Sequence, residues 1–156
     1  MPATPALRQD SLGAWLLKAS PAGGALDEHV ETGFANVTTR CVRPSYRTSL
    51  VRAGQPVLLW VSGRDPRLPA GLHAVGETTG PVDESPEGPV LPVRLAALVP
   101  PVPRAALAAD PVLSGIEVLR MPAGSNPSYL DVAQYAALCA AFPQVDRPDE
   151  RSLGNA

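Results

Sequence analysis

The chain has 156 residues, of which 45% are hydrophobic and 18% charged, values typical of a single folded globular domain. Its net charge of −2 excludes a global positive field that would attract nucleic acid, so any contact with a polyanion must be local. No stretch is long and apolar enough to span a membrane, and the first residues lack a signal-peptide pattern, which predicts a cytoplasmic protein.

The N-terminal third is predicted to contain two strands and one short helix. Residues 1–12 are polar and proline-bearing, so we expect them to be flexible. The apolar run 13–20 and the β-branched run 36–42 have the composition of strands. Pro44 can open a helix and Gly54 can end one, which predicts a short helix between them.

The middle of the chain is predicted to be a series of strands. Residues 55–63 form a continuous apolar run of strand length, which indicates a buried central strand. After a turn, residues 72–79 are expected to pair with it as a hairpin. Residues 80–88 are acidic and carry proline and glycine, so they are predicted to form an exposed loop before another strand at 89–98.

The C-terminal third is predicted to hold a short helix at 103–110, a strand at 116–121 and a longer helix within 126–142. The longer helix has the clearest helical spacing of apolar residues in the chain. Ser128 and Asp131 are spaced like a capping box at its beginning.

These elements together predict the fold class. We expect an α+β domain over residues 13–142, built as a compact β-barrel of five or six strands. Short helices fill the connections and a helix ends the domain. Residues 143–156 are mostly polar and are expected to be flexible, like residues 1–12.

The sequence offers no catalytic or metal-binding constellation. His29 and His73 have no nucleophile beside them, and no HExxH, GxSxG or phosphate-loop spacing occurs. Cys41 and Cys139 lie far apart and form no cluster with the histidines. We therefore expect a protein that is not an enzyme and needs no metal or cofactor.

Arginines concentrate in one part of the chain. Residues 40–67 contain six arginines and one acidic residue, a local excess of +5. Tyr46 lies between Arg43 and Arg47, and an aromatic ring beside guanidinium groups is what stacking on an unpaired base requires. The alternative is that Tyr46 packs under a helix while the arginines are solvated. Trp60 lies inside a predicted strand, where a core position is expected.

Four segments in order resemble the EVE domain of the PUA-like superfamily. They are "AWLLKASP", "VRPSYR", "AGQPVLLWVSG" and "AGLHAVGETTG". The stretch "EVLRMPAGSNPSYLDVAQYAAL" is also similar to the closing strand and helix of such proteins. The resemblance covers residues 13–141, nearly the whole chain.

The resemblance implies a PUA-like barrel with a cleft, related to the YTH and SRA-type modules that hold a base extruded from its strand. The residues that it implies for the base pocket are Lys18, Ser20, Cys41, Arg43, Tyr46 and Ser62. The residues that it implies for phosphate contacts are Arg43, Arg47, Arg52 and Arg64. The Ser62 hydroxyl can equally well cap a turn.

Two positions depart from the family pattern. Cys41 stands where many relatives carry a tryptophan, and losing that ring removes a stacking contribution of about 1–3 kcal/mol per base. Either Tyr46 or Trp60 supplies the ring instead, or the ligand is smaller. Gln55 replaces a common aspartate, which we interpret as a detail of a turn.

The leading hypothesis is a monomeric, non-enzymatic module that binds a modified or unpaired base of RNA or DNA in a barrel-mouth pocket. A pocket for a small metabolite, without nucleic-acid contact, is the alternative. A hydrolase or transferase would need a constellation that the sequence lacks. A partner-binding subunit would use the acidic loop around Asp83 and Glu84.

Overall fold

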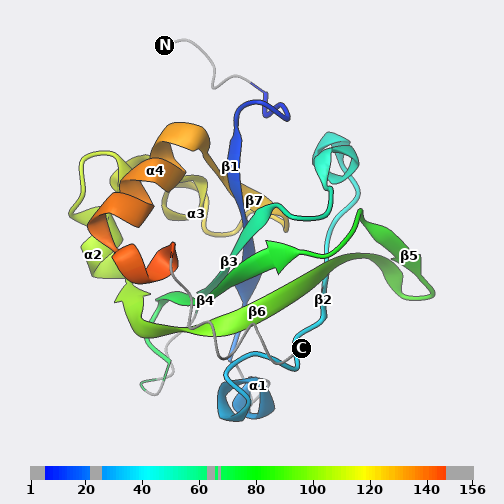
Figure 1. The fold of residues 1–156 in the computed structure, drawn as a ribbon, viewed down its shortest axis with the longest axis horizontal. Coiled ribbons are helices and arrows are strands. Elements are labelled where there is room, and N and C mark those ends of the chain that lie inside the picture. The colour runs from blue at the N-terminus through cyan, green and yellow to red at the C-terminus, as the bar shows by residue number, and fades with distance from the viewer. Residues whose placement is uncertain (1–5, 22–25, 63–65, 67, 147–156) are drawn as a thin grey trace.

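The structure is a computed structural model that describes residues 6–21, 26–62, 66 and 68–146. Within these ranges the chain is an α+β domain in which one curled sheet is covered by short helices (Figure 1). Its strands are β1 (Leu12–Ala19), β2 (Thr39–Cys41), β3 (Pro56–Val61), β4 (Gly71–Thr78), β5 (Asp83–Ser85), β6 (Gly88–Pro103) and β7 (Ser128–Asp131). Its α-helices are α1 (Asp27–Glu31), α2 (Arg104–Ala108), α3 (Glu117–Arg120) and α4 (Val132–Ala141). The 3₁₀ turns are η2 (Tyr46–Leu50), η3 (Leu113–Gly115) and η4 (Pro143–Val145).

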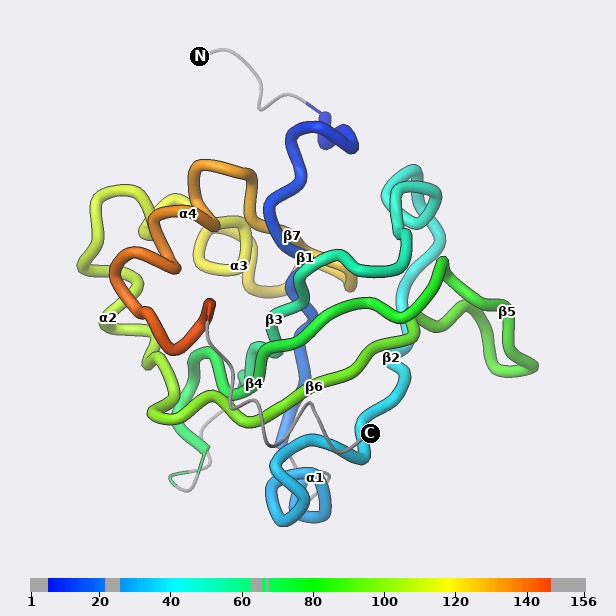
Figure 2. Tube along the Cα trace, viewed as in Figure 1, coloured from blue at the N-terminus to red at the C-terminus, as the bar shows by residue number. Residues whose placement is uncertain are grey.

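The strands follow the order β2-β6-β4-β3-β1-β7, and β5 pairs with β6 beside this path. The long strand β6 crosses the molecule and carries β5 at one end (Figure 2). β1 and β3 are parallel, whereas the other pairs are antiparallel. The sheet curls far enough for Arg43, just after β2, to donate its backbone N–H to the carbonyl of Asn126, just before β7, at 2.9 Å. We call this meeting of the two sheet edges the seam.

The sheet is buried on both faces. Successive side chains of its central strands point in opposite directions, and each face packs into its own hydrophobic core. Trp15 and Leu17 of β1 belong to an inner core on the concave side of the sheet. Ala14 and Leu16 of the same strand belong to a second core under the helices. The helices α2, α3 and α4 gather on this second side of the sheet (Figure 1). The concave side is therefore filled with side chains.

Several predicted elements are confirmed. The runs 13–20, 55–63, 72–79 and 89–98 correspond to β1, β3, β4 and β6, and β3 and β4 form the expected antiparallel hairpin. The helix predicted within 103–110 is α2. The segment after Pro44 forms the 3₁₀ turn η2, which the Ser45 hydroxyl caps by accepting from the backbone N–H of Arg47 at 3.2 Å.

The strand predicted at 116–121 is wrong, because this segment forms the one-turn helix α3. The edge of the sheet next to β1 is already taken by β7, which pairs antiparallel with β1. Residues 116–121 pair with none of the described strands, and Ile116 and Val118 bury their side chains in the core under the helices instead.

The beginning of the C-terminal helix is also corrected. Ser128 lies in β7, and α4 begins only after Asp131. The capping box is formed by Asp131 and Gln134, in which Asp131 Oδ1 accepts from the Gln134 backbone at 2.8 Å and Gln134 Oε1 accepts from the Asp131 backbone at 3.0 Å. The capping signal was thus present in the sequence, one turn later than predicted.

The segments expected to be flexible are partly packed against the domain. Leu7 is buried in the inner core with 4% of its surface exposed, and Val145 is buried in the other core. The ordered chain therefore begins before residue 12 and continues past residue 143. The remainder of both predicted segments lies outside the described residues. None of the helices in the described ranges has the length and apolar character needed to cross a membrane.

Candidate functional site

A cavity of about 260 Å³ lies at the seam of the sheet. Arg43 and η2 form one side, and α3 with the loop that leads to β7 forms the other. The described residues that line it are Arg43, Ser45, Tyr46, Arg47, Glu117, Met121, Gly124, Ser125, Asn126 and Pro127. All of them lie in connections or short helices, none in a strand. The sequence predicts a pocket in the mouth of the barrel; the structure places this cavity at the seam, where the two edges of the curled sheet meet.

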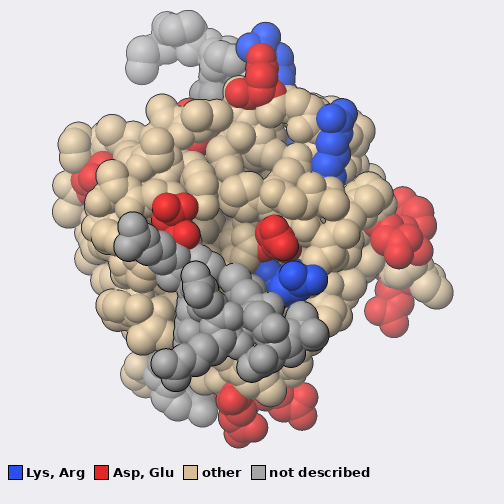
Figure 3. Space-filling model, viewed as in Figure 1, with Lys and Arg blue, Asp and Glu red and all other residues tan. Residues whose placement is uncertain are grey.

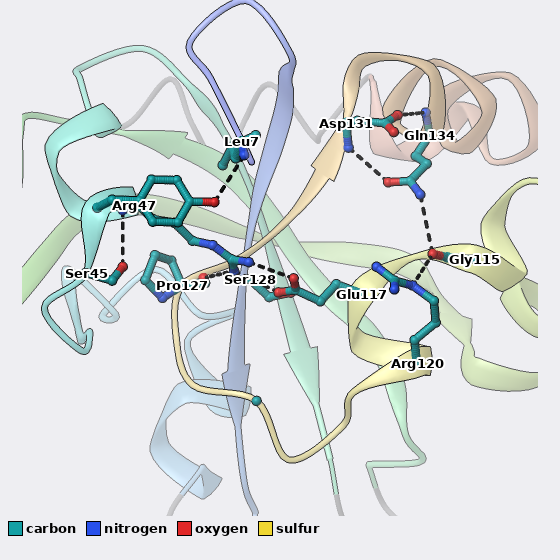
Figure 4. A network of polar contacts seen from close by, with 12 residues as sticks. Leu7, Ser45, Arg47, Gly115, Glu117, Arg120, Pro127, Ser128, Asp131 and Gln134 are labelled. Atoms are coloured by element: carbon teal, nitrogen blue, oxygen red, sulfur yellow. Dashed lines mark hydrogen bonds and ion pairs between the residues drawn. The ribbon is translucent and has the colours of Figure 1, made fainter. Parts of the chain in front are cut away.

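An ion pair between Arg47 of η2 and Glu117 of α3 joins the two sides of the cavity (Figure 4). The guanidinium Nη1 donates to Glu117 Oε1 and Nη2 to Oε2, both at 2.8 Å. Nη1 also donates to the carbonyl of Pro127 at 3.0 Å. The guanidinium carbon lies 4.9 Å from the centre of the Tyr129 ring, within the range of a cation–π contact. Arg47 is therefore committed to the protein itself.

Both members of this pair are charged at neutral pH. Burial alone would raise the pKa of Glu117, but the hydrogen bonds from Arg47 and from the Ser128 hydroxyl outweigh it, and the pKa is lowered. The hydrogen bond to Glu117 raises the pKa of Arg47. Because the two charges cancel, the positive character of the cavity comes from other residues, above all from Arg43.

Two exposed apolar side chains flank the cavity. Tyr46 is 52% exposed and Met121 is 56% exposed, although both are large and hydrophobic. The Tyr46 hydroxyl accepts a hydrogen bond from the backbone N–H of Leu7 at 3.1 Å, which holds the ring against the N-terminal segment. Both side chains line the same cavity and leave apolar surface open to solvent there.

The loop on the other side of the cavity is attached to β1 through Lys18. The Nζ of Lys18 donates to the carbonyls of Gly124 and Pro122, and burial lowers the pKa of this amine. The backbone of Lys18 is bonded in turn to the Asn126 side chain, which accepts from the Lys18 N–H at 2.8 Å and donates to its carbonyl at 3.1 Å. Lys18 therefore positions the loop.

We expect Lys18→Met to loosen this loop. The Gly124 N–H, which donates to Met121 O at 3.0 Å, should exchange with solvent about 5- to 10-fold faster, because the hydrogen bonds lost from Nζ contribute roughly 1 kcal/mol. Amide exchange followed by NMR measures this change, and the amides of β4, remote from the loop, serve as the internal reference. Unchanged exchange at Gly124 would show that Lys18 does not hold the loop.

The structure brings together part of the predicted site. Arg43, Tyr46 and Arg47 line one cavity, and Lys18 contacts its loop from behind. Arg47, predicted as a phosphate contact, forms an ion pair with Glu117 in the structure. Residues predicted for the site that do not line this cavity are Ser20, Cys41, Arg52, Trp60 and Ser62. Arg64 lies outside the described residues.

Trp60 is corrected to a core residue because of its position in the register of the sheet. It shares a face of β3 with Leu58, and both side chains belong to the core under the helices, where Trp60 is 4% exposed. Ser62, just past the end of β3, donates its hydroxyl at 3.3 Å to the carbonyl of Ala19, at the end of the neighbouring strand β1. Cys41 is exposed on β2.

The sequence reasoning missed Glu117, Met121 and residues 124–126. Glu117 is the single acidic residue in an apolar segment that had been predicted to be a strand, and its isolation was the available signal. The stretch "GSNPS" contains small and polar residues just before β7. It matches no phosphate-loop pattern, so its sequence alone does not predict that it lines a cavity.

Apart from Glu117, none of the described acidic or histidine residues lines this cavity. On the face shown in Figure 3, acidic side chains gather at the β5 hairpin. His73 is buried with Nε2 at 2.7 Å from the Pro69 carbonyl, and His29 Nδ1 lies 2.8 Å from the Asn36 side chain. Within the part of the chain that the structure describes, no three His, Cys, Asp or Glu residues are grouped to hold a metal ion.

Comparisons with known proteins identify the fold. No family model matches the sequence, and no curated protein matches it significantly. The protein Rpa0253 of Rhodopseudomonas palustris has a similar structure, with a TM-score of 0.65, 16% identity, and coverage of 85% of this chain and 94% of that one. A hypothetical protein from Leishmania major has a TM-score of 0.65 at 15% identity, covering 90% of this chain and all of its own. Atu2648 from Agrobacterium tumefaciens has a TM-score of 0.61 at 15% identity, covering 86% and 96%. At these identities the likeness shows the fold alone.

Proposed function

We propose that this protein is a non-enzymatic module that binds an unpaired or modified base of nucleic acid in the cavity at the seam. The main support for this proposal is that an exposed aromatic ring, Tyr46, and an exposed arginine, Arg43, line the same cavity. A volume of about 260 Å³ is close to the lower end of ligand pockets, about 300–1,000 Å³, and is suited to one ring system rather than a long segment.

Arg43 is the candidate phosphate contact. Its side chain is exposed and makes one hydrogen bond to the described residues, from Nη1 to the Ser125 hydroxyl at 3.3 Å. Most of the guanidinium donors remain available, in contrast to those of Arg47. A base stacked on Tyr46 would place its backbone near these donors, which bind phosphate in a planar, forked geometry.

This proposal agrees with the resemblance to the EVE domain, and membership of that PUA-like family is part of the proposal. The ring that many EVE proteins carry at the position of Cys41 would be replaced here by Tyr46, and Met121 would supply a second apolar contact. The module would act as a reader of a single base, without chemical conversion of it.

Binding of a single-stranded oligonucleotide, followed by fluorescence anisotropy over a range of salt concentrations, tests the phosphate contact. For Arg43→Ala we expect weaker binding and a slope of log K against log salt that is smaller by about 0.7, the contribution of one phosphate contact on a single strand. Arg52→Ala is the matched control, because Arg52 is exposed but does not line the cavity.

Equal slopes for Arg43→Ala and the unmodified protein would contradict the proposed phosphate contact. Binding that is insensitive to salt, together with tight binding of an uncharged small molecule, would favour a metabolite pocket. The neutral Arg47–Glu117 wall is the observation that fits this second candidate.

A further inference from the structure

The carboxylate of Glu117 has an acceptor position that the protein does not use. Oε1 accepts two hydrogen bonds, from Arg47 Nη1 and from Ser128 Oγ, each at 2.8 Å. Oε2 accepts one, from Arg47 Nη2. A carboxylate oxygen accommodates about two donors, so within the described residues Oε2 has room for one more.

This unused position belongs to a residue that borders the cavity. Glu117 is one of the lining residues, and 15% of its side chain remains exposed. Its carboxylate is held at both oxygens, so it cannot turn to suit a ligand (Figure 4). Hydrogen bonds and the charge of Arg47 also lower its pKa, so it carries no proton to donate at neutral pH. The Glu117 carboxylate can therefore accept a hydrogen bond from a ligand but cannot donate one.

We propose that Glu117 makes the cavity selective for bases with an exocyclic amino group, such as cytosine and adenine, over their oxo counterparts, uracil and hypoxanthine. The inference rests on the proposed function of base binding. An amino group at the edge of the base donates to the open position on Oε2. An oxo group at the same place directs its lone pairs at the Glu117 carboxylate. Neither oxygen then has a proton to share, so no hydrogen bond forms and the two repel each other.

On the Glu117 side of the cavity, the neighbouring polar side chains are engaged within the protein, whereas the free donors of Arg43 are the candidate phosphate contact. The Asn126 side chain uses its oxygen and its nitrogen on the backbone of Lys18. The Ser45 hydroxyl accepts from the Arg47 backbone, and three of the five Arg47 guanidinium donors are engaged, two by Glu117 and one by Pro127. Glu117 therefore decides which base edge is accepted on its side of the cavity.

The test uses single-stranded oligonucleotides in which one base is flanked by abasic residues. One pair compares cytosine with uracil, and a second pair compares adenine with hypoxanthine. Binding to the full chain at pH 7 should be about tenfold tighter for the amino member of each pair. Glu117→Gln should reduce this ratio to below about threefold, because an amide can donate as well as accept. Glu77→Gln, an exposed glutamate outside the cavity, is the matched control and should keep the ratio.

The outcomes separate this inference from the function on which it rests. Equal affinity for both members of each pair, with binding still weakened by Arg43→Ala, would overturn the selectivity and leave base binding in place. An amino preference that persists in folded Glu117→Gln would overturn the role of Glu117. If no oligonucleotide binds, the proposed function itself is wrong and the inference falls with it. If Glu117→Gln does not fold, the comparison of the paired oligonucleotides with the unmodified protein decides.

Discussion

Tyr46→Ala should weaken the binding of single-stranded oligonucleotides by about 5- to 150-fold, the largest effect on binding expected of any substitution in the cavity. The range corresponds to the roughly 1–3 kcal/mol that stacking of one base on an aromatic ring contributes. Tyr46 is half exposed and borders the cavity, so its ring is available to a ligand without rearrangement of the core. Fluorescence anisotropy at one fixed salt concentration measures the change.

Tyr46→Phe is the matched control. It keeps the ring and loses only the hydroxyl that accepts from the Leu7 N–H at 3.1 Å. We expect its affinity to fall by less than about fivefold, since one neutral hydrogen bond contributes about 1 kcal/mol. Because Tyr46 is exposed, neither variant should lower the melting temperature by much. If Tyr46→Ala binds as tightly as the unmodified protein, stacking on this ring is excluded.

Glu117→Ala should destabilise the protein by about 2 kcal/mol at pH 7, the largest loss of stability expected of a single change at the site. The estimate lies between about 0–1 kcal/mol for exposed ion pairs and about 3–5 kcal/mol for fully buried ones, because the Arg47 and Glu117 side chains keep 21% and 15% of their surface exposed. The substitution also leaves the buried Ser128 hydroxyl without its acceptor. Urea unfolding measures the difference.

The loss should depend on pH in a definite direction. The folded state lowers the pKa of Glu117, so the carboxylate contributes stability that is fully present above its unfolded pKa of about 4.3. This contribution disappears as the pH falls through the lower folded value. The difference between the unmodified protein and Glu117→Ala should therefore be constant from pH 6 to 8 and shrink in acid.

Glu77→Ala is the comparison for this prediction. Glu77 pairs with Arg94 at 3.7 Å, but the two side chains are 50% and 47% exposed, so its removal should cost less than about 1 kcal/mol. If Glu77→Ala and Glu117→Ala lower the free energy of unfolding equally at pH 7, the largely buried, bidentate Arg47–Glu117 pair stabilises the protein no more than an exposed ion pair does.

The strands of this protein could be predicted from local patterns because their cause is local. The runs 13–20 and 55–63 are apolar over most of the length of a strand, the mixed run 72–79 follows a turn as a hairpin partner, and each became a strand. The segment 116–121 has the same composition, yet it became α3. Which apolar run joins a sheet depends on the free edges of that sheet, and this is a property of the whole fold.

The candidate site could be predicted on one side only. Tyr46 and Arg43 lie three residues apart, so a single short stretch indicated an aromatic ring beside a cation. The opposite wall comes from Glu117 and the loop before β7, about 70 positions further along the chain. Nothing in the local pattern connects the two stretches, and Trp60 was assigned to the site because its register in the sheet was unknown.

The amino-acid sequence by itself thus determined the α+β class, most of the strands, and the gathering of arginines around one tyrosine. Periodicity and composition act over a few residues, and these features need no more than that. Only the tertiary structure decided where the hollow lies, which arginine is free and which is bound by Glu117. These depend on the curling of the sheet, which brings the ends of β2 and β7 together at the seam and sets Arg47 against a carboxylate from a distant helix.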